Sequence, residues 1–163
     1  MKASDISPTF KDDTFTVDNT TQSPCGQPNV NKQFPPVTDV GSQAESTAGD
    51  LLFQEEVSIY KDAATGAQAF NAGKESVSCT QGTIGTNSET VTFSPAKDVS
   101  STFGVPEAVE IDFQASDVQG ALFAIHSGDS IVTFQFAGKT SADTSTIPSP
   151  EDIVKQGLTK LSS

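Results

Sequence analysis

Cys25 and Cys79 are the most informative chemical feature of this chain, because they are its only two thiols. Two such residues can form a disulfide, remain as free thiols, or supply half of a metal site. Their long separation excludes the Cys-x-x-Cys pattern of redox and zinc motifs. With a single histidine in the chain, a zinc site would also lack a fourth strong ligand. A disulfide is therefore favoured. It would stabilise the fold by about 4 kcal/mol and place the protein outside the reducing cytoplasm.

His126 is the single side chain that ordinarily titrates near neutral pH. It ends an expected strand, directly before the turn-forming residues 127–130. A Ser-His-Asp constellation is assembled in space rather than along the chain, so a hydrolase centred on His126 stays open as an alternative. No Gly-x-Ser-x-Gly elbow supports that alternative. A histidine at the rim of the sheet without a catalytic role is favoured.

Paired carboxylates occur at Asp12-Asp13 and at Glu55-Glu56. Adjacent residues of a strand point to opposite faces, so Glu55 and Glu56 should not form a catalytic pair. One of them should face inward and need a partner such as a lysine. Asp12, Asp13 and Asp18 lack the spacing and the glycine of a calcium loop. We therefore expect no catalytic residues, no metal site and no cofactor.

Composition narrows the class of protein further. The 163 residues suit one domain, and a hydrophobic fraction of 34% with 11 Phe predicts a modest core. The net charge of −12, with nine lysines and no arginine, argues against nucleic-acid binding and against adsorption to anionic lipid.

No apolar run approaches the roughly 20 residues that span a bilayer, and residues 1–5 lack the apolar part of a signal peptide. We expect a mature, extracytoplasmic fragment from which an export or lipid signal was removed. Any membrane attachment would then come from an N-terminal lipid anchor absent from this chain.

The middle of the chain predicts a strand followed by a helix. Residues 51–59 alternate between apolar and polar side chains, as a half-buried strand does. Asp62 is a suitable N-cap for an Ala-rich helix, and Gly73 is a suitable terminator. The expected inward face of this helix contains Ala63, Ala67 and Phe70.

The rest of the chain predicts an antiparallel meander and a closing helix. Strands are expected at residues 14–17 and 90–93, and three more at residues 108–114, 121–126 and 131–136. A final helix begins after the N-cap Ser149, with Pro150 at its first position. Its expected inward residues are Ile153, Val154, Gly157, Leu158 and Leu161.

The fold class is therefore α+β, an antiparallel sheet packed on one face against two or three helices, with a single disulfide. Residues 1–50 form a polar segment of the same domain, tied down by Cys25 and containing a helical turn at residues 3–6. Residues 51–163 form the α+β sandwich core.

Several stretches together resemble the PknH-like extracellular sensor domains of actinobacteria. They are the run from Val57 to Tyr60, the Ala-rich residues 62–70, Cys79, the Gly128-Asp129 turn between two strands, and the closing helix at residues 150–161. Such domains form the outer part of some receptor serine/threonine kinases and also occur as free-standing lipoproteins. The similarity covers residues 20–162.

The resemblance implies an antiparallel sheet flanked by helices, a cleft for an unidentified ligand and no enzyme activity. It matches Cys25 and Cys79 to a disulfide pair. Kinase-linked members carry a second pair that this chain lacks, which favours the free-standing lipoprotein type.

The leading hypothesis is a non-enzymatic, sensor-like or ligand-binding domain of a bacterial cell-envelope lipoprotein. Its partner would be a small molecule or an envelope component, held on the open sheet face or in a cleft between the sheet and the helices. The alternative is a structural or adhesive surface module that acts through protein contacts. The candidate ligand-binding residues are Tyr60, Phe113, Phe123, His126, Phe134 and Phe136.

Overall fold

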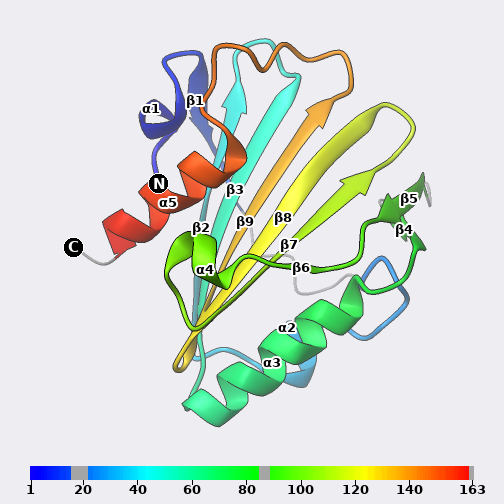
Figure 1. Ribbon diagram of the computed structural model, residues 1–163, viewed down its shortest axis with the longest axis vertical. Coiled ribbons are helices and arrows are strands. Elements are labelled where there is room, and N and C mark those ends of the chain that lie inside the picture. The colour runs from blue at the N-terminus through cyan, green and yellow to red at the C-terminus, as the bar shows by residue number, and fades with distance from the viewer. Residues whose placement is uncertain (16–21, 85–88, 162–163) are drawn as a thin grey trace.

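The structure is a computed structural model that describes residues 1–15, 22–84 and 89–161. Within these residues a nine-stranded antiparallel sheet has the order β1-β2-β3-β9-β8-β7-β5-β4, with β6 also paired to β7 (Figure 1). The strands are β1 (Phe10–Asp13), β2 (Thr38–Ser46), β3 (Leu51–Ile59), β4 (Gln81–Ile84), β5 (Glu89–Phe93), β6 (Lys97–Asp98), β7 (Glu107–Gln114), β8 (Val118–Ser127) and β9 (Ser130–Lys139). The helices are α1 (Ala3–Ile6), α2 (Val30–Gln33), α3 (Ala63–Ser76), α4 (Ser100–Phe103) and α5 (Pro150–Leu161). The predicted fold class is confirmed.

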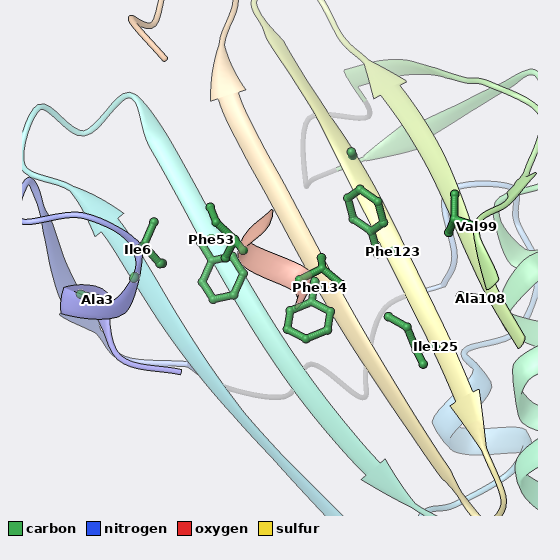
Figure 2. Close-up of a cluster of buried hydrophobic side chains, with 12 residues drawn as sticks. Ala3, Ile6, Phe53, Val99, Ala108, Phe123, Ile125 and Phe134 are labelled. Atoms are coloured by element: carbon green, nitrogen blue, oxygen red, sulfur yellow. The ribbon is translucent and has the colours of Figure 1, made fainter. Parts of the chain in front are cut away.

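Helices pack on both faces of the sheet, and not on one face as the sequence suggested. The first face buries an apolar cluster in which Phe53, Phe123 and Phe134 meet residues of α1 and α5. Their side chains project from neighbouring strands to the same side of the sheet (Figure 2). The opposite face buries Tyr60, Ala69, Phe70 and Ile131, against which Val30 and Phe34 of the α2 region pack. The sequence predicts α3 and α5 as helices but carries no signal of which face of the sheet each one covers, and the short helix α2 was not predicted.

Two glycines let helices approach the sheet closely. A Cβ on Gly157 of α5 would lie 2.6 Å from the ring of the fully buried Phe134. A Cβ on Gly66 of α3 would lie 3.0 Å from the carbonyl oxygen of Gly128, in the β8–β9 turn. A glycine inside a helix lowers the intrinsic stability of the helix, but Gly66 allows α3 to contact this turn closely.

Several predicted boundaries and faces are wrong in detail. α3 runs through Gly73 to Ser76, and its buried face is Gly66, Ala69 and Phe70, while Ala63 is exposed. Leu161 is 50% exposed and does not belong to the inward face of α5. The strand expected at residues 14–17 lies earlier in the chain, as β1 at Phe10–Asp13. Thr14 and Phe15 follow β1 and are not part of a strand, and residues 16–17 lie outside the described residues.

The polar N-terminal part supplies α1, β1, α2 and β2, although most of it was expected to run over the surface. β2 pairs along its length with β3, yet its nine residues include only two apolar side chains, Val40 and Ala44. The predicted disulfide joins Cys25 to Cys79, with Cα atoms 5.7 Å apart. It links the segment before α2 to the chain that leaves α3.

Candidate functional site

A cavity of about 850 Å³ lies on the α1/α5 face of the sheet, at the end where β9 leaves for α5. The residues around it fall into two groups. Apolar residues that are buried or half-buried form its floor and walls: Ile6, Phe10, Leu51, Leu52, Phe53, Phe93, Phe113, Ala121, Phe136, Ala137, Ile147 and Ile153. Polar residues, nearly all of them exposed, surround the opening: Thr92, Ser94, Asp112, Gln114, Gln119, Lys139, Thr144 and Ser149. We call this hollow the large cavity.

Sheet strands and a tethered loop position the walls of the large cavity. The ring of Phe136 lies 5.1 Å from that of Phe53 and 6.0 Å from that of Phe123, which fixes it in the aromatic layer of the core. The segment between β9 and α5 runs across one end of the sheet (Figure 1). Backbone hydrogen bonds hold the start of this segment, from Lys139 N to Asp50 O and from Thr140 N to Asp117 O, both 2.9 Å. Ile147, further along the segment, also lines the cavity, and its backbone N–H donates to Thr144 O at 3.3 Å.

A smaller cavity of about 320 Å³ lies on the opposite face, between α3 and the sheet. Ala69, Phe70 and Val77 line it from the α3 side, and Val109, Leu122 and Ile131 line it from the strands. It also has a polar end, formed by Asn31, Glu56, Ser58, Tyr60 and Lys74. We call it the α3 cavity.

Glu56, at the polar end of the α3 cavity, has the carboxyl group of Asp39 beside it. Asp39 accepts hydrogen bonds from the Nδ2 of Asn31 (3.0 Å) and from the Oγ of Ser58 (3.1 Å). Burial, and then the nearby Asp39 carboxylate, raise the pKa of Glu56 to about 7. Burial is also the main cause that raises the pKa of Tyr60 to about 12. Glu56 therefore carries a proton below neutral pH, and the Tyr60 hydroxyl stays neutral at physiological pH.

His126 sits in a closed set of contacts and not at an open catalytic centre. Its Nδ1 lies 2.6 Å from Oε2 of Glu107, and its Nε2 lies 2.9 Å from the carbonyl oxygen of Gly128. Its ring stacks on Phe70 at a centroid distance of 5.4 Å. Both ring nitrogens are occupied, and no hydroxyl is among their partners within the described residues. The hydrolase alternative therefore lacks the Ser or Thr contact that it requires.

Glu55 is the inward-facing member of the Glu55-Glu56 pair, as alternation predicted, and is 5% exposed. Its partner is not a lysine. Glu55 Oε2 contacts the amino group of Met1 and accepts a hydrogen bond from Ser42 Oγ at 3.3 Å. These polar contacts satisfy the carboxylate within the first face of the sheet.

The six candidate ligand-binding residues do not form one site. Phe113 and Phe136 line the large cavity, and Tyr60 lines the α3 cavity. Phe123 and Phe134 are 1% and 0% exposed and fill the core, while His126 makes the contacts described above. The sequence missed Phe10, Phe53 and Ile147 as cavity residues, and Asn31 and Asp39 as neighbours of Glu56. Only the alternation around Phe53 signalled an inward position, and the other four carried no local signal.

Two further features bear on the function. Among the described residues, no group of three or more histidine, cysteine, aspartate or glutamate side chains could hold a metal ion. Within the same residues, no helix is both long and apolar enough to cross a membrane.

Comparisons with known proteins give a likeness of fold alone. No protein-family model matches the chain, and no curated protein matches its sequence. Among solved structures, it is similar to the extracellular domain of PknH from Mycobacterium tuberculosis, with a TM-score of 0.67 and 10% sequence identity. That match covers 94% of this chain and 87% of the other. The chain thus has a PknH-like fold, as the sequence motifs suggested.

Proposed function

We propose that this chain is a non-enzymatic, extracytoplasmic binding domain of the sensor type, and that it holds a small molecule in the large cavity. The observation that carries the proposal is the cavity itself, about 850 Å³ of space with an apolar floor and a polar rim. Ligand sites in proteins have volumes of roughly 300–1,000 Å³ and combine apolar walls with a few polar groups.

Three observations support the compartment and the class. A disulfide between Cys25 and Cys79 is typical of proteins in oxidising surroundings. The fold is similar to that of an extracellular domain. The occupied ring of His126 gives no support to acid–base chemistry. We extend the proposal to the cell envelope of an actinobacterium, with attachment through a lipid anchor upstream of this sequence, as in free-standing lipoproteins of this type.

The adhesive-module alternative has less support. It calls for a filled sheet face and a continuous exposed apolar patch. The large exposed apolar side chains of the described residues are Val37, Val40 and Leu161, and three such side chains make only a small apolar surface. The first sheet face carries a hollow and not a flat, filled surface.

Binding of Nile red, an uncharged dye that fluoresces in apolar surroundings, tests the proposal. We expect saturable binding at one site, and its loss in Ile147→Asp, which puts a carboxylate into the cavity wall. The matched control is Val40→Asp, which places the same charge at an exposed apolar residue outside the cavity and should leave binding unchanged. Absence of saturable binding, or equal loss in both variants, would contradict the proposal.

A further inference from the structure

We propose that the ligand of the large cavity is an amphiphile with an elongated hydrocarbon chain, such as an acyl or isoprenoid chain, held with its polar head at the rim. This inference rests on the proposed function and names the chemical class of the molecule that is bound. Three properties of the cavity carry it: its shape, the chemistry of its floor and the charges at its opening.

The large cavity is elongated across the sheet. The strands that line it include β3, β9, β8, β7 and β5, which are five successive strands of the sheet, and Phe10 of β1 also contributes to the lining. Adjacent strands lie about 4.8 Å apart, so the cavity extends over roughly 19 Å across the sheet. An extended chain can occupy the whole trough, whereas a compact molecule would contact only part of it.

The floor of the large cavity offers nothing to a polar ligand body. Its residues are the apolar set named above, with Phe53, Phe136 and Ala121 from adjacent strands at the centre. Every buried side-chain nitrogen or oxygen among the described residues already has a hydrogen-bond partner. A ligand with polar groups along its length would lose its water contacts there without replacement, which is unfavourable. The buried part of the ligand must therefore be hydrocarbon.

The rim of the large cavity suits a polar head. Its charged residues are one acidic side chain, Asp112, and one basic side chain, Lys139, both exposed. The remaining rim side chains are uncharged hydroxyl and amide groups. A head with no net charge meets no repulsion at this opening, so we choose a zwitterionic head for the probes.

Displacement of Nile red by a series of lysophosphatidylcholines tests the inference. Probes with octanoyl, decanoyl, dodecanoyl, tetradecanoyl and hexadecanoyl chains share one head and differ only in chain length, and each is used below its critical micelle concentration. Burial of each added CH₂ should tighten binding about fourfold, until the chain fills the trough and the affinity stops rising. Ile147→Asp should weaken every member of the series. Ile147→Trp should shorten the chain length at which the affinity stops rising.

The possible outcomes separate this inference from the proposed function. If Nile red binds and Ile147→Asp removes it, but affinity is independent of chain length, the cavity binds a ligand and the chain inference is overturned. If affinity rises without a limit and is equal in wild type and both Ile147 variants, binding is non-specific partitioning, and the chain inference also fails. If neither the dye nor any chain binds saturably, the proposed function fails with it. Circular dichroism of each variant confirms that it is folded, and Ile147→Trp keeps the test decisive if Ile147→Asp does not fold.

Discussion

The carboxyl group of Glu56 on β3 lies beside that of Asp39 on the neighbouring β2, across the sheet from the large cavity. Because Ser58 is the register partner of Asp39, these two residues are diagonal neighbours on the same face. Two carboxylates cannot both stay charged at such close range without repulsion, so one of them retains a proton. The pair makes the stability of this domain depend on pH.

Stability should fall as pH rises through the range in which Glu56 titrates. Its pKa is raised to about 7 in the folded protein from an ordinary 4.5. The folded state therefore keeps a proton that the unfolded chain has already lost. The contribution is fully present below pH 4.5 and is lost as pH rises to 7. Glu56→Gln, which imitates the protonated group, should raise the free energy of unfolding at pH 8 by on the order of 2 kcal/mol.

Urea unfolding at several pH values between 4.5 and 8 measures this effect. Glu75→Gln removes one exposed carboxylate from α3 and is the matched control. A stabilisation at pH 8 that is the same in both variants would mean that relief of general negative charge, and not the pair, is the cause.

Two glycines of α3 should respond in opposite ways to alanine. A Cβ at Gly73 meets nothing within 4 Å, so Gly73→Ala should stabilise the fold by about 1 kcal/mol through helix propensity. A Cβ at Gly66 would lie 3.0 Å from Gly128 O and 3.3 Å from the Asp129 backbone. Gly66→Ala should therefore lose that gain and destabilise the fold by about 1 kcal/mol. Thermal unfolding measures both, and a stabilised Gly66→Ala would mean that α3 does not dock on the β8–β9 turn.

The disulfide should contribute substantially to stability. It closes a loop with a sequence separation of 54, for which the chain-entropy relation gives about 4 kcal/mol. The double variant Cys25→Ser/Cys79→Ser should lose this amount in denaturant unfolding under oxidising conditions. Addition of reductant should lower the stability of the wild-type protein and leave the double variant unchanged. A double variant as stable as the oxidised wild type would contradict this role.

His126→Ala should weaken the fold without affecting the ligand site. The variant loses the contacts to Glu107 and Gly128 O and the stacking on Phe70, which should cost about 2 kcal/mol or more. His126 does not line the large cavity, so Nile red binding by the folded variant should match that of the wild type. Loss of binding in a variant that remains folded would show that the two regions are coupled.

The strongly patterned half of the fold could be predicted from sequence. The meander, the strand at Leu51–Ile59 and the N-cap Asp62 followed from alternation and capping chemistry, which are local properties. β2 could not be predicted, because its stability comes from pairing with β3 and not from its own polar residues. The end of α3 was misplaced at Gly73 because a glycine costs a helix only about 1 kcal/mol and does not have to end it.

The candidate site was less predictable than the fold. Sequence reasoning selected aromatic residues of the meander, but whether a ring lines a cavity or fills the core depends on which helix lies above it. Phe134 is covered by α5 at Gly157 and is fully buried. Phe136, two residues along the same strand, lies beyond that cover and lines the large cavity. Ile147 was missed because it lies in a polar segment with no periodicity.

An NMR titration of the isotopically labelled protein with dodecanoyl lysophosphatidylcholine tests the central claim most directly. The account predicts saturable shifts that cluster at the backbone amides of Leu51, Phe53, Ala121, Phe136 and Ile147, with no comparable shifts around the α3 cavity. Saturable shifts around Glu56, Tyr60 and Phe70 instead, or shifts that do not saturate, would contradict the claim that the large cavity is the binding site.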